Sequence, residues 1–175
     1  MNKIKYLLLS SLLAVFSTSL LAEGTYVLNA ERAMLSTQYA QDEFKKLGED
    51  PDIMADQERL ELLQTEVNAI VEDFQQNQET LSEEERLDIQ GKLEDKQAEG
   101  QFLGQKLQTK AQEAEQRIIN DIYPDFQRIL GELINAKSMD LVVRPQAIFY
   151  ADPDMDITDE VTALLDVALA KKSEE

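Results

Sequence analysis

Apolar residues recur with a seven-residue spacing between positions 53 and 81 of this chain. Ile53, Leu60, Val67, Phe74 and Leu81 are seven apart, and Leu63 and Ile70 fall between them, so the spacing alternates between three and four. This is the pattern of a helix that pairs with a second helix along a narrow seam. A helix packed on a globular core would show a wider apolar stripe, whereas the flanks here are Glu, Asp and Gln.

The partner of this helix is predicted to be the segment that follows it. Asp50 and Pro51 form a start signal for the first helix, and Ser82 with Glu85 forms a capping box that starts a second helix over residues 83–137. The second seam is weaker: Leu93, Gly100, Leu107 and Ala114, with Gln97, Gly104, Ala111 and Ile118 interleaved. Pro124 predicts a kink. We expect a helical-hairpin arm over residues 48–123, with Ile53, Leu60, Leu63, Val67, Ile70, Phe74, Leu93 and Leu107 in its seam.

Residues with high strand propensity lie at the two ends of the mature chain. Residues 25–28 are predicted to form a strand, residues 140–144 and 147–150 a β-hairpin around Pro145, and Thr158 to begin a final helix. Folding back of the arm brings these ends together as a base of residues 23–47 and 124–175. The predicted fold is therefore α+β, mainly α, with an antiparallel arm projecting from a small β-base.

A base of three strands and one short helix is expected to be too small to bury a stable core, and its sheet would have open edges. We therefore expect an oligomer in which neighbouring subunits share the sheet. The candidates for contacts in the base and between subunits are Tyr26, Leu28, Leu141, Val143, Ile148 and Tyr150.

The first 22 residues have the three parts of a secretory signal. Lys3 and Lys5 precede an uncharged run over residues 6–22, which ends in the small residue Ala22. A membrane anchor is the alternative, but the run barely reaches the ~20 apolar residues that a spanning helix needs. We expect a signal peptide at residues 1–22 and export of the mature chain.

Charge and composition exclude several classes of function. The chain has 17 basic and 35 acidic residues, a net charge of −18, and neither His nor Cys. This balance argues against binding nucleic acid or anionic lipid, and the missing residues are common catalytic groups and metal ligands. Asp152, Asp154 and Asp156 have the spacing of a calcium loop but lack its later glycine and glutamate, so they are interpreted as a solvated loop. We expect no enzyme activity, no cofactor and no metal.

The end of the chain resembles a known family. Residues 138–144 (SMDLVVR), 147–150 (AIFY) and 156–161 (DITDEV) are similar to the ending of the Skp (OmpH-like) family of periplasmic chaperones, and the order of elements resembles that family over residues 23–175. The resemblance implies a jellyfish-like homotrimer whose base is a shared β-barrel. Its helical arms would enclose a cavity that holds unfolded outer-membrane or envelope proteins without ATP. Candidates for contact with such clients, by residue type, are Tyr39, Phe44, Phe102 and Phe126.

This chain departs from the family in charge, because the best-known members are basic. A lipopolysaccharide site is therefore not carried over, and neutral or positively charged client segments should be favoured. The alternative function is a coiled-coil structural or adaptor protein that binds one folded envelope partner. A holdase would suppress aggregation of a denatured outer-membrane protein, whereas an adaptor would not.

Overall fold

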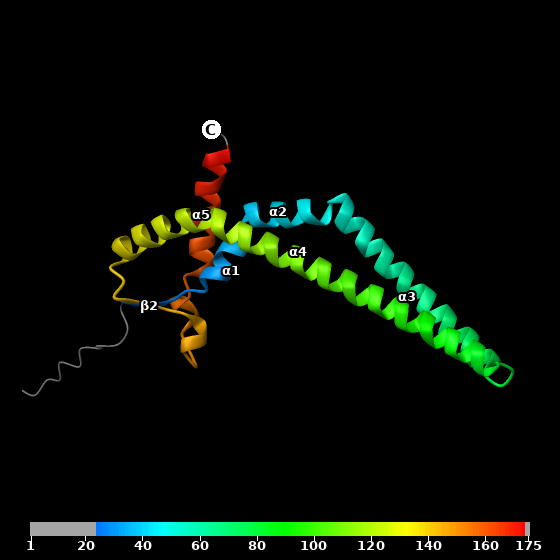
Figure 1. Cartoon of the computed structure of the whole chain (residues 1–175). Coiled ribbons are helices and arrows are strands. Elements are labelled where there is room, and N and C mark those ends of the chain that lie inside the picture. Colours follow the sequence, from blue (N-terminus) through cyan, green and yellow to red (C-terminus); the bar gives the residue numbers. More distant parts are fainter. Residues whose placement is uncertain (1–23, 174–175) are drawn as a thin grey trace, which may run out of the picture.

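A computed structural model describes residues 24–173, and the predicted signal peptide lies outside these residues. The elements are β1 (Thr25–Val27), α1 (Ala30–Leu35), α2 (Gln38–Gly48), α3 (Pro51–Asn77), α4 (Glu83–Lys137), β2 (Leu141–Val143), the 3-10 turns η1 (Pro145–Ala147) and η2 (Pro153–Met155), and α5 (Thr158–Ser173). The α3–α4 hairpin projects away from a base formed by the other elements (Figure 1). The predicted α+β, mainly α fold is confirmed.

Both arm helices begin with the capping groups that the sequence indicates. The Asp50 carboxylate accepts hydrogen bonds from the backbone N–H groups of Asp52 and Ile53, at 2.9 and 3.4 Å. The backbone N–H of Ser82 donates to Glu85 Oε2 at 2.8 Å, and that of Glu85 donates to Ser82 Oγ at 3.3 Å. Helix α4 continues through Pro124, and its ribbon curves over this last part (Figure 1), as expected where a proline removes one backbone donor.

The base contains a hydrophobic core within a single chain, so the expectation that it is too small for one is wrong. Helices α1 and α5 pack against the C-terminal part of α4. Ile122, Val161 and Leu165 have no exposed surface. The core comprises Leu28, Ala33, Met34, Ala40, Ile118, Ile122, Phe126, Ile129, Leu133, Met139, Ile157, Val161 and Leu165. The prediction underestimated the base because about five turns of α4 belong to it as well as to the long helix.

Strands β1 and β2 are parallel, and their register pairs Thr25 with Leu141 and Val27 with Val143. The other side of β1 is occupied at one point, where the N–H of Ile157 donates to the carbonyl of Val27 at 3.0 Å. Gly24 is required beside β2, because an added Cβ would lie 2.1 Å from Asp140 Oδ2. The sheet thus joins the start of the described chain to the segment that directly follows α4.

The predicted β-hairpin over residues 140–150 is wrong within the single chain. After β2 the chain enters turn η1, where the N–H groups of Ala147 and Ile148 donate to the carbonyls of Arg144 and Pro145 at 3.0 and 3.3 Å. These donors are therefore not free to form a ladder with β2. Ile148 has extended backbone angles, and the Tyr150 side chain is 82% exposed. Apart from its β1 side, β2 has no strand partner in the described part of the chain.

Candidate functional site

The arm is held together along a seam that is only partly apolar. The arm seam consists of Ile53, Asp56, Leu60, Leu63, Val67, Ile70 and Phe74 on α3, and Ile89, Leu93, Lys96, Gly100, Leu103 and Leu107 on α4, all buried or half-buried. It includes all eight residues that the sequence placed there, and Ile53, Leu63 and Leu103 are its buried members. The other apolar members remain half-exposed, so the arm has no dry core comparable to that of the base.

One row of the predicted α4 seam is wrong by a single position. Gln97, Gly104 and Ala111 were expected between the helices but are exposed. Lys96 and Leu103, each one residue earlier, take these places. A half-buried lysine does not register as an apolar position, and this hides the true spacing from a search for hydrophobic residues.

Ion pairs cross from α3 to α4 along one side of the arm seam. The Arg59 guanidinium donates two hydrogen bonds to the Glu99 carboxylate, from Nε at 2.7 Å and Nη2 at 2.8 Å. Lys96 pairs with Glu66, which also accepts from Arg59 Nη1 at 3.3 Å. Nearer the base, Lys106 Nζ lies 2.6 Å from Asp56 Oδ2. These contacts link the helices at three levels.

The ion pairs shift the pKa values of their members toward the charged forms. Hydrogen bonds from Lys96 lower the pKa of Glu66, and those from Arg59 lower the pKa of Glu99. The adjacent Asp56 carboxylate raises the pKa of Lys106 in turn. All of these groups lie near solvent, where such pairs contribute little to stability individually. The pairing of α3 with α4 therefore depends in part on ion pairs whose strength changes with salt and pH.

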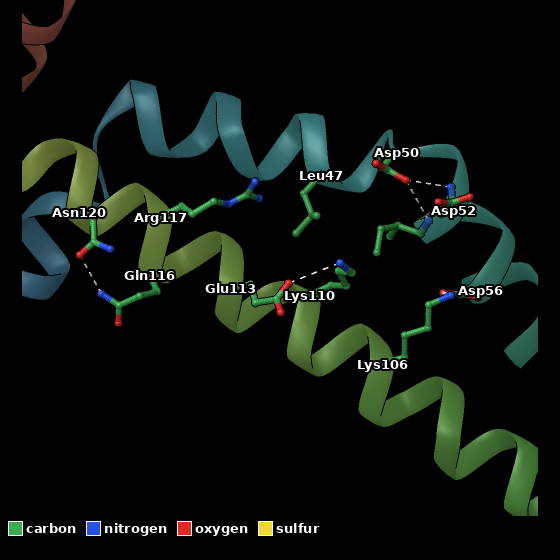
Figure 2. A pocket seen from close by; sticks show the side chains of 11 residues that line it. Leu47, Asp50, Asp52, Asp56, Lys106, Lys110, Glu113, Gln116, Arg117 and Asn120 are labelled. Atoms are coloured by element: carbon green, nitrogen blue, oxygen red, sulfur yellow. Dashed lines mark hydrogen bonds and ion pairs between the residues drawn. The ribbon is translucent and has the colours of Figure 1, made fainter.

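A cavity of about 540 Å³ lies where α2 ends and α3 begins, facing α4 (Figure 2). The chain bends between α2 and α3, and beyond this bend α3 runs back toward α4 (Figure 1). Leu47 and Ile53 supply apolar walls, and the remaining lining residues are polar: Asp50, Asp52, Asp56, Lys106, Lys110, Glu113, Gln116, Arg117 and Asn120. Asp56 Oδ2 is buried at its edge and accepts no hydrogen bond of good geometry, although it faces the Lys106 ammonium. The cavity is therefore lined by four acidic and three basic side chains.

The four aromatic candidates for contact with a client lie on different elements. Phe44 on α2 is 36% exposed and Phe102 on α4 is 66% exposed. Tyr39 is half-buried and donates its hydroxyl to Asp121 Oδ2 at 3.1 Å, and burial raises the pKa of its hydroxyl. Phe126 is buried in the core of the base, so its prediction as a client contact is wrong. Tyr123, which stacks on Phe126 with ring centroids 6.2 Å apart, is the exposed aromatic there.

The six candidates for contacts between subunits are divided between the interior and the surface of the base. Leu28 is 4% exposed and belongs to the core of its own chain, so it is not available to a second subunit. Tyr26, Val143 and Ile148 are half-buried, and the ring of Tyr26 lies beneath the Lys137 ammonium, 5.8 Å from the ring centroid. Leu141 and Tyr150 are exposed. These two retain apolar surface that a second chain could cover.

The sequence analysis missed a second apolar surface of the base. A groove of about 480 Å³ runs between α4 and α5, and its apolar walls are Ile129, Leu133, Ala136, Leu164, Val167 and Ala168. Val167 is 55% exposed and lies outside the stripe by which α5 packs on the core. An apolar residue outside that stripe was the signal that could have revealed this surface.

The aspartates of the calcium-like spacing cap local turns. Asp152 accepts a hydrogen bond from the Asp154 N–H at 3.1 Å, and Asp156 accepts one from the Thr158 N–H at 2.8 Å. Burial raises the pKa of Asp156, but the hydrogen bonds from Thr158 outweigh it and lower the net value. Residues 24–173 contain no group of three or more side chains placed to bind a metal ion. Within the same residues, no helix has the length and hydrophobicity to cross a bilayer.

Comparison with known proteins identifies the family. No curated protein matches the chain by sequence. In fold, the chain is similar to the crystal structure of a candidate outer membrane chaperone (OmpH-like) from Caulobacter crescentus, with 21% identity, a TM-score of 0.48, and coverage of 83% of this chain and 85% of that one. The profile of the family described as "Outer membrane protein (OmpH-like)" matches residues 25–165, which span both the base and the whole arm. The chain therefore belongs to the OmpH-like family.

Proposed function

We propose that this protein is an ATP-independent holdase chaperone that binds unfolded outer-membrane or envelope proteins between helical arms and prevents their aggregation. The match of the OmpH-like family over residues 25–165 carries the proposal, because it includes the arm as well as the base. The related structure from Caulobacter crescentus is described as a candidate outer membrane chaperone. We place the mature protein in the periplasm, after removal of residues 1–22.

The arm suits reversible binding of an unfolded chain. At about 1.5 Å per residue, the 27 residues of α3 give the hairpin a reach of roughly 40 Å. Much of its surface is polar and exposed, and exposed apolar residues such as Met54, Leu62 and Phe102 are scattered along it. Many weak contacts spread over several arms give useful total affinity, while each contact remains easily broken. Binding of this kind requires no bound nucleotide and no preorganised catalytic site.

Assembly of three chains through the base is part of the proposal. Strand β2 has an outer edge without a partner among the described residues, and the extended segment at Ile148 leads to the exposed Phe149 and Tyr150. An exposed strand edge beside exposed aromatic residues favours strand addition between chains. A closed sheet of this kind would direct the arms around a common space.

Sedimentation equilibrium of the mature protein tests the assembly. We expect a mass three times that of one chain, and a shift toward the monomer for Phe149→Asp combined with Tyr150→Asp. Leu87→Asp combined with Phe102→Asp introduces the same charges on exposed apolar residues of the arm and is the matched control. A monomeric wild-type protein would contradict the assembly.

Light scattering during refolding tests the holdase activity. A urea-denatured eight-stranded outer-membrane β-barrel is diluted into buffer with and without the mature protein, in the absence of nucleotide. We expect scattering to be abolished near one trimer per client. If scattering is unchanged while the protein captures one folded envelope protein, the adaptor function replaces the proposal.

The contribution of the arm can be measured by shortening it in register. Residues 64–70 and 90–96 lie opposite each other, because Arg59 pairs with Glu99 and Glu66 with Lys96. Deleting both segments removes one seven-residue repeat from each helix and shortens the arm by roughly 10 Å. The seam keeps its spacing, so the variant should fold and assemble normally. We expect weaker protection of the largest clients, whereas equal protection of all clients would place binding outside the arm.

A further inference from the structure

The two sides of the arm seam have opposite chemistry. The charged side consists of the residues that directly precede Leu60, Val67 and Phe74 on α3 and Leu93, Gly100 and Leu107 on α4. These residues are Arg59, Glu66, Asp73, Lys92, Glu99 and Lys106. The uncharged side consists of the residues that directly follow Asp56, Leu63 and Ile70 on α3 and Ile89, Lys96 and Leu103 on α4. These residues are Gln57, Gln64, Val71, Gln90, Gln97 and Gly104. Each residue turns a helix by about 100°, and the helices are antiparallel. The residues that follow the seam on both helices therefore share one side of the arm.

The described contacts support this division. The ion pairs of Arg59 with Glu99 and of Lys96 with Glu66 connect the two helices on the charged side. Four of the six charged-side residues are half-buried, because their side chains lie across the arm seam. All six residues of the uncharged side are exposed. In a chain with a net charge of −18, an ordered row without a single charge is a specific surface feature.

We propose that the uncharged side is the surface of the arm that receives an extended segment of unfolded polypeptide, an inference that rests on the proposed holdase function. A glutamine side chain has two N–H donors and a carbonyl acceptor, the same groups that an unpaired peptide backbone offers and requires. Such contacts do not depend on the sequence of the client. Gly104 has no atom within 4 Å of the position of an added Cβ, so a client backbone can approach α4 closely there.

Charge favours this side over the other one. On the charged side, Arg59 and Lys106 already pair with acids of the arm, so they are not free to attract an acidic client segment. The remaining acids there repel such a segment. The uncharged side lacks this local repulsion. The row of residues next to it, farther from the seam, contains the amides Asn68, Gln75, Gln101 and Gln108 and the acids Glu61 and Glu94. Gln64 and Asn68 hydrogen-bond to each other at 3.1 Å, within one helix.

Fluorescent labels can locate the bound client, since the chain contains no cysteine. Gln64→Cys on the uncharged side and Asp73→Cys on the charged side are both exposed positions of α3. Each full-length mature variant is labelled with an environment-sensitive dye and mixed with the urea-denatured outer-membrane barrel. We expect an emission shift at residue 64 and little or none at residue 73. Equal shifts at both positions, or a shift at residue 73 alone, would overturn the inference.

Substitutions test whether the amides themselves bind. Gln64→Glu with Gln97→Glu should weaken the affinity for the denatured barrel about tenfold, because amide donors are lost and repulsion is added. Thr65→Glu with Gln105→Glu adds the same number of charges at exposed outer positions and should change the affinity for the barrel less than twofold. Gln64→Ala with Gln97→Ala adds no charge and should weaken binding roughly threefold. Equal effects of the two glutamate pairs, or wild-type affinity of the alanine pair, would refute the role of the amides. If the wild-type protein itself fails to keep the barrel soluble, the proposed function fails instead.

Discussion

The base and the arm are both helical, but their interiors differ. In the base, Ile122, Val161 and Leu165 are completely enclosed by residues of the same kind. In the arm, most seam residues are half-exposed, and Lys96 and Asp56 occupy seam positions beside their ion-pair partners. Apolar burial contributes about 25 cal/mol per Å², so the base carries most of the stability of the chain. The difference indicates that the arm can open locally while the base stays folded, which suits the proposed binding of unfolded clients.

The largest loss of stability is expected from a substitution that creates a cavity in the base. Ile122→Ala removes a side chain with no exposed surface and should cost about 2–5 kcal/mol of the free energy of unfolding. The measurement is urea unfolding followed by circular dichroism at fixed protein concentration, because assembly would make the midpoint depend on concentration. Ile89→Ala, at a half-buried position near the arm tip, is the control and should cost less. Equal losses for both would mean that the arm and the base unfold as one unit.

A cavity in the arm should have a smaller and more local effect. Leu63 is 3% exposed, yet its surroundings are open enough to relax, so Leu63→Ala should cost about 2 kcal/mol. Hydrogen exchange should show this loss in residues 51–77 and 83–110, with unchanged protection of residues 118–133. An equal loss of protection in the base would contradict local opening of the arm.

The same difference explains which parts of the structure the sequence predicts. On the α3 side of the seam, apolar side chains mark nearly every position of the repeat, so the sequence indicates the buried face of this helix directly. On the α4 side, one row was misplaced by one residue, because Lys96 occupies a seam position without a hydrophobic signal. Lys96 can do so because Glu66 neutralises it across the seam, a contact between residues 30 positions apart.

The core of the base was underestimated for another reason. It combines segments around residues 28–40, 118–139 and 157–165, and no single segment shows its size. The spacing of Ile118, Ile122, Phe126, Ile129 and Leu133 does form a helical stripe, and it could have identified this part of α4 as a core helix. Residues 147–150 are of types that favour strands, but a strand requires a partner, and sequence alone does not state which chain supplies it.

The tip of the arm should be less stable than both the rest of the arm and the base. Ser82→Ala removes the capping box at the start of α4 and should cost about 1 kcal/mol. Because the tip lies farthest from the core, we expect faster hydrogen exchange in residues 83–90 and no change in the melting of the base. Ser82→Thr keeps the hydroxyl and serves as the control. A lower melting temperature of the base would show that the tip and the base are coupled.

The smallest loss of stability is expected from removal of the ion pairs on the charged side. The pH dependence of this loss distinguishes the contribution of the ion pairs from that of apolar packing. Hydrogen bonds with Lys96 and Arg59 lower the pKa values of Glu66 and Glu99 below their ordinary value of 4.5. A lowered folded-state pKa stabilises the arm fully above the unfolded value, and this contribution is lost as the pH falls through the folded value. The difference in arm protection between wild type and Glu66→Gln with Glu99→Gln should therefore be constant above about pH 4.5 and shrink below it.

Comparison with a second variant isolates the pairing from the overall charge, since acidification also relieves the repulsion within this acidic chain. Glu58→Gln with Glu72→Gln removes the same number of charges from exposed outer positions of α3. We expect the charged-side variant to lower arm protection at neutral pH and the outer variant to leave it unchanged or raise it. Added salt should reduce the effect of the first variant, because screening weakens exposed pairs. If the Glu66→Gln with Glu99→Gln variant lowers arm protection equally at pH 3, Glu66 and Glu99 stabilise the arm by packing and not by ion pairing. The contrast between an arm held by polar contacts and an apolar base would then be much weaker.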